Sequence, residues 1–394
     1  MSNNEIDSLL ARLNEIFNLP DGDKDSSPSF GFCYKNKTKR ISGTLFNEYF
    51  VIYHKLYELY KLKEKKISFN TFHDSTRVFL FEQRFNDESI KKWINSQKLQ
   101  KYICYTNIYG ITIPKSFSVG CYTFLQLNEA NAELAKAKIH FRNSSFLIES
   151  FINENSLEKV CVRFEIDSCD RNFASQELDY KADQLIYLLR FLYGTKEKVN
   201  RIGKQKVTEE NDGHLVLSDD GIRIKSSSSS KLVCIPITSA FFSSEDNELF
   251  TNLFLKAEKN NLELALMKSI EWIGMSIIEQ YDDIAITEIV NGFETVLRYD
   301  DGGPLTKSIQ GQISENVALL VGNSLEERKQ LISTCKDMYR FRSSVAHGSR
   351  KEETGLYYEY FGLLRKTMLA ILKHYSHCSS VKQLNEELEN FKLR

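Results

Sequence analysis

One short segment of the sequence combines a histidine and an arginine that could together do acid–base chemistry on a phosphate. His347 follows Arg342 by five residues and precedes Gly348, and glycine commonly ends a helix. At the last turn of a helix the free carbonyl groups favour a protonated imidazole, and histidine, with an unperturbed pKa of about 6.5, can transfer protons at neutral pH. A guanidinium can bind a phosphate through two parallel hydrogen bonds. The pair therefore predicts metal-independent RNA cleavage, with His347 as the base for the 2′-hydroxyl and Arg342 stabilising the phosphorane.

Helix geometry leaves open which arginine works with His347. Successive helical residues turn by about 100°, so the side chains of Arg342 and His347 diverge by about 140°. Arg340 lies seven residues before His347 and is nearly eclipsed with it, and Ser344 is on the same face. Arg342 can still converge with His347 if the helix tightens or ends between them, or if a second copy contributes its own pair across a two-fold axis. An exposed arginine and a helix-capping histidine remain the alternative interpretation.

The elements expected to position this segment are helices. From about residue 243 nearly all of the sequence has helical periodicity, and the breaks contain turn residues such as Gly302-Gly303-Pro304 and Gly322-Asn323-Ser324. The expected helices cover roughly 244–259, 262–280, 284–298, 309–321, 325–347, 354–375 and 380–391. Arg342 and His347 would then lie in the last turns of a long helix.

The first part of the chain has a different, mixed pattern. Helices are predicted at 5–19, 87–96, 128–138 and 172–193, and strands at 76–85, 101–114, 117–127, 157–167 and 231–237, with a hairpin turning on Asp220-Gly221. The expected fold class is therefore an α+β N-terminal domain, residues 1–240, followed by an all-α C-terminal domain, residues 241–394.

The segment from Arg342 to Gly348 resembles the Arg-x4–6-His signature of the HEPN superfamily, in which a polar residue often follows the arginine. Ser343 occupies that place. The order of helices over residues 262–394 resembles the ApeA-like HEPN subgroup. A helix at 288–297 lies upstream, Tyr339 precedes the Arg–Ser pair, and a tail helix runs through 381–384.

This resemblance implies a HEPN helical bundle that dimerises, so that two motifs face each other and form one ribonuclease site. It implies catalytic roles for Arg342 and His347. In this register Arg340 and Ser343 are supporting residues, and Glu294 is either a buried acid that orients the motif arginine or a surface glutamate. The family also implies roles in antiviral defence, toxin-like systems and RNA processing.

Two functions follow as hypotheses. The first is a homodimeric endoribonuclease that leaves a 2′,3′-cyclic phosphate, whose N-terminal domain senses a trigger or selects RNA and which an unidentified companion protein could regulate. The alternative is a catalytically silent dimerisation or RNA-binding scaffold. The net charge of −1 excludes a strongly basic coat protein for nucleic acid but leaves room for a small basic site.

The cysteines and the hydropathy bear on the compartment. The 8 cysteines are scattered without a C-x-x-C pair, and the first residues form an amphipathic helix pattern rather than a leader. No apolar run approaches the roughly 18 residues that cross a bilayer. We therefore expect reduced thiols in a cytoplasmic protein without a membrane partner.

Other residues capable of chemistry have simpler interpretations. His73-Asp74 is interpreted as a loop pair. His374, His377 and Cys378 have possible metal spacing, but no second ligand pair accompanies them, so a polar helix end is favoured and neither a metal nor a cofactor is predicted. The basic stretch 196–206 is either an RNA contact or a solvated linker.

Overall fold

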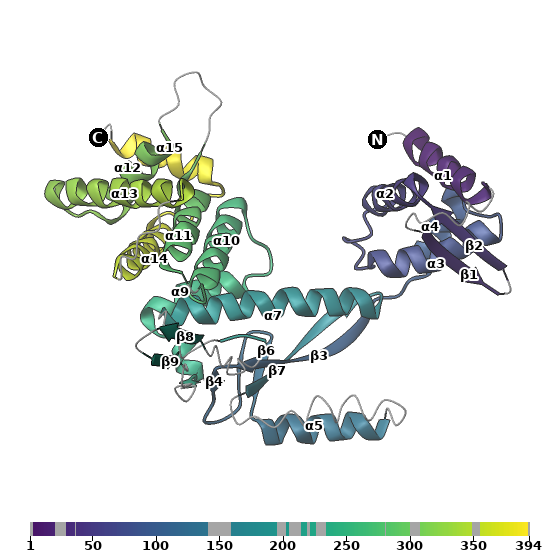
Figure 1. Ribbon diagram of the computed structural model, residues 1–394, viewed down its shortest axis with the longest axis horizontal. Coiled ribbons are helices and arrows are strands. Elements are labelled where there is room, and N and C mark those ends of the chain that lie inside the picture. The colour runs from purple at the N-terminus through teal and green to yellow at the C-terminus, as the bar shows by residue number, and fades with distance from the viewer. Residues whose placement is uncertain are drawn as a thin grey trace. The chain divides into compact units, whose positions relative to one another are not determined.

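The protein is described by a computed structural model (Figure 1). It describes residues 3–19, 29–35, 37–140, 159–194, 202–204, 214–218, 221–225, 234–279, 281–299, 308–348 and 355–392. The chain forms two compact units. Unit 1 comprises residues 1–104 and 164–180, and unit 2 comprises residues 105–163 and 181–394. The division passes through three elements: β3 (Gln100–Tyr109), β7 (Lys159–Ser168) and α7 (Arg171–Tyr193).

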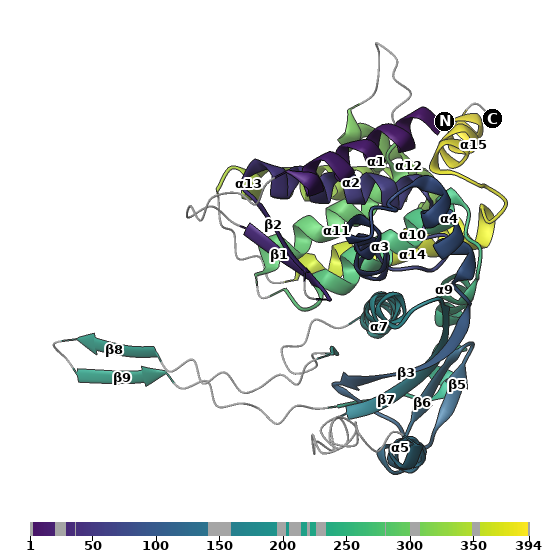
Figure 2. The same cartoon turned by 90° about the vertical axis from the view of Figure 1, so that its right-hand side faces the viewer.

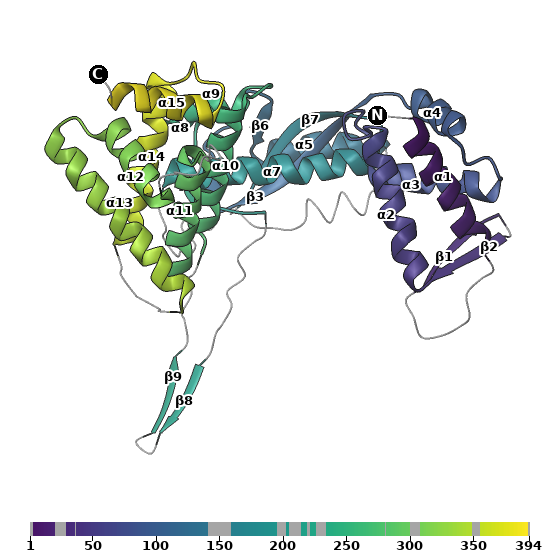
Figure 3. The ribbon, with the colours of Figure 1, turned by 90° about the horizontal axis from the view of Figure 1, so that it is seen from above.

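Unit 1 is built from short helices around an aromatic core. Its further elements are α1 (Asn3–Asn18), β1 (Ser29–Tyr34), β2 (Lys37–Ser42), α2 (Thr44–Leu59), α3 (Phe69–Phe81) and α4 (Asp87–Ser96). Strands β1 and β2 form an antiparallel hairpin, and α1 and α2 pack against each other and against β2 (Figure 3). Helix α1 buries Leu10, Leu13 and Phe17, whose spacing of three and four residues defines one helical face.

Helix α3 corrects a prediction, because residues 76–85 were expected to form a strand. The helix begins at the N-cap Ser68, whose hydroxyl accepts from the Thr71 amide. Its buried residues are Phe72, His73, Thr76, Phe79 and Leu80, a helical pattern rather than an alternating one. The β-branched and aromatic residues of this stretch favour strands intrinsically, but packing against the core decides the outcome.

A four-stranded sheet contains β3, β7, β6 (Tyr122–Leu125) and β5 (Phe117–Val119) in that order. Consecutive residues of β6 face opposite sides. Phe124 lies against Phe242, whereas Leu125 packs with Ala130 of α5 (Leu127–His140), which covers that side of the sheet (Figure 2). The strand predicted at 157–167 and the helix predicted at 128–138 are confirmed, and the strand predicted at 101–114 is confirmed as far as Tyr109. The prediction of one strand at 117–127 is wrong, because the chain turns at Gly120 and the segment forms the antiparallel pair β5 and β6.

Two short strand pairs and one short helix complete the mixed part of the described chain. A two-residue strand β4 (Ile111–Thr112) pairs in parallel with β10 (Ile235–Pro236). Strands β8 (His214–Ser218) and β9 (Gly221–Lys225) form the hairpin predicted around Gly221. Helix α8 (Ser239–Phe242) follows β10.

The remaining residues form the helical region of unit 2. It contains α9 (Glu245–Leu255), α10 (Asn261–Ser276), α11 (Asp282–Leu297), α12 (Ile309–Val321), α13 (Leu325–Ala346), α14 (Leu356–His374) and α15 (Val381–Lys392). All of the helices expected after residue 243 are present, so the helical character of the C-terminal region is confirmed. Helix α11 packs against α10, α12, α13, α14 and α15, and eight of its residues are buried. Helix α11 therefore lies at the centre of the helical region and supports α13.

The boundary predicted at residue 240 and the two compact units differ. The change from mixed to helical structure does occur there, since α8 begins at Ser239. However, residue 240 lies inside unit 2, because aromatic side chains of the sheet, Tyr122 and Phe124, pack against Phe254 and Phe242 of the following helices. Among the described residues, no helix is long and apolar enough to cross a membrane.

Candidate functional site

The Arg–His segment forms the end of α13, as the sequence predicted. The helix starts at the N-cap Ser324, whose hydroxyl accepts from the Glu327 amide. Its C-cap is His347, and the next residue, Gly348, has a φ of 83°. A side chain would be strained in that left-handed conformation, so glycine is the residue that lets the chain turn there. His347 therefore lies at the end of the helix.

Arg342 forms an ion pair with an acidic residue of the central helix α11. Its Nη1 lies 3.7 Å from Oε1 of Glu294, in α11. The Arg342 side chain is 39% exposed, whereas that of Glu294 is 16% exposed. The same carboxylate oxygen accepts a hydrogen bond of 3.1 Å from the Tyr339 hydroxyl. One half-buried acid thus holds two side chains of α13, while the guanidinium still reaches solvent.

The position of Glu294 follows from the packing of α11. Its neighbours Phe293 and Val296 are fully buried, which fixes the rotation of the helix and leaves Glu294 at the edge of the core, facing α13. The pKa of Tyr339 is raised above its usual value, first by burial and then by the charge of Glu294. The phenol therefore stays neutral and can keep donating to the carboxylate at physiological pH.

The other predicted site residues lie on the surface of α13. His347 is exposed, and none of the described residues makes a hydrogen bond or ion pair with its side chain. Ser343 is exposed, and its carbonyl accepts from the His347 amide at 3.2 Å. Arg340 has a side chain that is 73% exposed and pairs with Asp337 at 2.6 Å. The Ser344 hydroxyl donates to the carbonyl of Phe341.

The structure thus brings together Arg342, Tyr339 and Glu294, but not Arg340 and His347. Of the possibilities left open for Glu294, the half-buried acid paired with Arg342 is the one observed. The sequence alone did not give Tyr339 a partner. Its position three residues before Arg342 places both on adjacent turns of one helix face, which is the signal that could have indicated a shared partner.

Comparisons with protein-family models, curated proteins and solved structures find no match for this chain.

His73 and the basic stretch do not extend this site. His73 is buried in α3, not in a loop as expected, and its Nε2 lies 3.2 Å from the Tyr49 hydroxyl. Burial lowers the pKa of His73 to about 4, more than the nearby Asp74 raises it. It is a core histidine. Most of the stretch 196–206 lies outside the described residues, and within it Lys204 pairs with Asp183 at 2.9 Å.

Proposed function

We propose that the chain is a homodimeric, HEPN-type endoribonuclease that cleaves RNA at Arg342 and His347 without using a metal in the reaction. One observation carries the proposal. Arg342 pairs with Glu294, which also accepts from Tyr339, near the solvent-reaching end of α13, and four helical residues later the helix ends at an exposed His347. An oriented guanidinium and an exposed imidazole at the same helix end suit a phosphodiester when two copies combine them.

The reaction uses the RNA itself as the nucleophile. The His347 imidazole takes the proton of the ribose 2′-hydroxyl, and the 2′-oxygen forms a bond to phosphorus. Arg342 stabilises the charge that develops on the phosphorane oxygens. The bond from phosphorus to the 5′-oxygen then breaks, and the leaving oxygen takes a proton from the His347 imidazolium of a second copy. The products are a 2′,3′-cyclic phosphate and a 5′-hydroxyl.

The dimer is proposed because the motif of one copy contains only one histidine. In addition, the side chains of Arg342 and His347, five residues apart on a helix, diverge by about 140°. Two motifs related by a two-fold axis would supply a base, an acid and two cations. Light scattering of the purified protein is expected to give twice the chain mass. A stable monomer with full activity would contradict the composite site.

The decisive experiment compares three substitutions at the end of α13. His347→Ala should slow cleavage by roughly 10²–10⁴-fold, the usual value of a general acid or base. Arg342→Ala should cost about 3–4 kcal/mol of transition-state stabilisation. Arg340→Ala is the matched control, because it removes the same charge from an exposed position on the same helix and should change mainly RNA affinity.

Two outcomes of that comparison would refute the assignment. If Arg340→Ala abolishes cleavage and Arg342→Ala is nearly normal, the aligned helical face is the active one. If all three variants cleave like the wild type, the site lies elsewhere. Thermal melts accompany each variant, because Arg342→Ala also removes the ion pair to Glu294, and a loss of folding would mimic a loss of catalysis.

The product ends test the chemistry separately from the residues. Because the motif supplies its own base and cation, cleavage should persist in EDTA and leave cyclic-phosphate ends. An absolute Mg²⁺ requirement with 5′-phosphate products would contradict the mechanism.

The alternative function is a dimerisation or RNA-binding scaffold. The observation that favours it is the ion pair itself, since a guanidinium bound to Glu294 could serve only to join α13 to α11. The two functions differ in one measurement. A scaffold would bind RNA in a gel-shift assay without shortening it, and Arg342→Ala would then lower thermal stability alone.

A further inference from the structure

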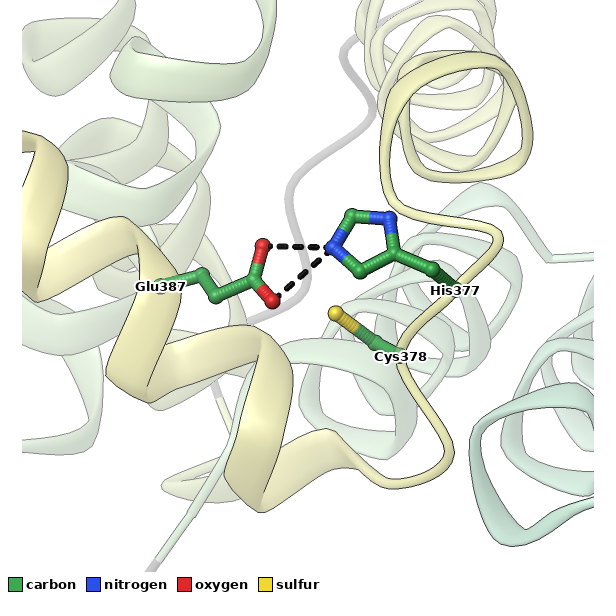
Figure 4. Close-up of side chains that lie close together, drawn as sticks. All are labelled: His377, Cys378 and Glu387. Atoms are coloured by element: carbon green, nitrogen blue, oxygen red, sulfur yellow. Dashed lines mark hydrogen bonds and ion pairs between the residues drawn. The ribbon is translucent and has the colours of Figure 1, made fainter.

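We propose that His377, Cys378 and Glu387 form a binding site for a zinc ion that joins the loop after α14 to helix α15. The ligand atoms that the three side chains offer all lie within 4.8 Å of one another. Figure 4 shows the imidazole, thiol and carboxylate pointing toward a common centre, two of them from the loop and one from the helix. Imidazole nitrogen, thiolate sulfur and carboxylate oxygen are the protein ligands that zinc prefers.

The spacing of these atoms fits a tetrahedral ion after a small movement. Nε2 of His377 lies 2.9 Å and 2.8 Å from the two carboxylate oxygens of Glu387. Ligand atoms around tetrahedral zinc are about 3.5 Å apart, given bond lengths of about 2.0–2.3 Å. The side chains of His377 and Glu387 are 58% and 32% exposed, so both can shift to bring ligand-atom separations between 2.8 and 4.8 Å toward this value. Their exposure also leaves the fourth position of the ion to water.

The third ligand is held in place by the backbone around it. Cys378 is buried, and its amide donates to the carbonyl of Tyr375 at 3.0 Å. The Cys378 carbonyl accepts from Nδ2 of Asn260 at 3.4 Å, and the next carbonyl, of Ser379, accepts from the amide of Leu262 at 3.2 Å. The start of α10 thus fixes the loop, and the sulfur does not depend on the ion for its position.

Glu387 is positioned independently, through the packing of α15. Leu384 and Leu388 are fully buried, and Asn385 between them is hydrogen-bonded to α11 and α12. The carboxylate is therefore presented by a docked helix, and the cysteine by a fixed loop. An ion bound by both would join the two segments with little loss of conformational freedom, which favours tight binding.

The charges and softness of the ligands select the ion. A thiolate and a carboxylate supply two negative charges and the imidazole none, so a divalent cation gives a neutral complex. A thiolate ligand favours zinc over the hard ions Mg²⁺ and Ca²⁺. A nucleophilic cysteine is the competing interpretation of a Cys–His–Glu cluster. Cys378 is buried, however, whereas a nucleophilic cysteine is partly exposed to its substrate.

The test is binding of Co²⁺ and Zn²⁺ to the full-length, metal-stripped protein. Co²⁺ is used because a cysteine-bound ion gives a thiolate-to-metal charge-transfer band and, when tetrahedral, strong visible bands. We expect one ion per chain with both signals. Glu387→Gln should weaken Zn²⁺ binding on the order of 100-fold, since even outer-shell changes cost 10–100-fold. Cys378→Ser should remove the charge-transfer band.

Matched controls make each outcome decisive. Glu386→Gln changes a neighbouring exposed carboxylate of α15, and Cys335→Ser changes another buried cysteine, so both should bind like the wild type. Added Zn²⁺ should raise the melting temperature of the wild type but not of Glu387→Gln. If the wild type binds no ion, or if Glu387→Gln binds as tightly as the wild type, the site is refuted. Because Arg342 and His347 lie on α13, RNA cleavage can fail or succeed without altering this result.

Discussion

The buried His73 predicts that unit 1 loses stability in mild acid. The imidazole is surrounded by the rings of Phe50, Tyr53 and Phe69, and its pKa is lowered to about 4, chiefly by burial. Arg77 and His54 lower it slightly further, whereas Asp74 raises it. In the unfolded chain the pKa is near 6.5. Between these values the unfolded state binds a proton that the folded state does not.

The sign and size follow from that difference. The contribution of neutral His73 to the free energy of unfolding is fully present above pH 6.5 and decreases as the pH falls toward 4. Below pH 4 both the folded and the unfolded states are protonated, and the contribution no longer changes. A pKa of about 4 against 6.5 corresponds to roughly 3 kcal/mol of unfolding free energy. That is a large part of the 5–15 kcal/mol typical of a folded domain.

Urea unfolding at a series of pH values measures this loss. Trp93 packs against the core of unit 1, and replacing the second tryptophan, Trp272 of α10, with Phe leaves Trp93 as the reporter. His73→Gln is the comparison, because its amide can still bond the Tyr49 hydroxyl but does not titrate. The wild type should lose roughly 3 kcal/mol more than this variant between pH 7 and pH 4. Parallel curves for the two proteins, or a folded-state His73 pKa near 6.5 by NMR, would refute the reasoning.

Two further predictions concern the helical region. Gly292→Ala should destabilise unit 2 by about 1–3 kcal/mol in thermal unfolding, because an added Cβ would lie 2.7 Å from Cδ2 of Leu364. Gly362→Ala, where nothing lies within 4 Å of the added Cβ, should instead stabilise by up to about 1 kcal/mol, and equal effects of the two changes would contradict the packing argument. Asn385→Ala should cost about 3 kcal/mol, since the buried amide of Asn316 and other groups lose their partner. Faster hydrogen exchange confined to α15 would support this assignment, and an unchanged melt would refute it.

The helical half of the fold could be predicted because its signals are local. Caps and periodicity agree in α10, where Asn260 and Glu263 form a capping box, and in α13, which begins after Ser324. In unit 1 the signals conflict. The stretch around Phe79 has strand-forming residues, and it is helical because that face packs into a core made by residues far away in the chain.

In the candidate site, too, the features set by neighbouring residues could be predicted and the contacts between helices could not. The position of His347 at a helix end follows from Gly348, one residue away. The contact of Arg342 with Glu294 joins residues 48 positions apart on different helices, and periodicity within one helix does not reveal which neighbour it faces. Glu387 was missed for the same reason, since it lies on α15 while the sequence drew attention only to the histidines and cysteine before it.

Asp170 has a consequence for the order in which the chain can fold. Its carboxylate accepts from the amide and hydroxyl of Ser68, the N-cap of α3, at 2.8 and 2.9 Å, and from the amide of Phe173 in the first turn of α7. Unit 1 is also completed by residues 164–180. During synthesis, unit 1 is therefore complete only after residues 105–180, about 75 further residues, have emerged from the ribosome. Stalled nascent chains ending before Asp170 should be cleaved readily by protease within α3, and those ending well beyond α7 should be protected. Equal protection would show that the early segment folds alone.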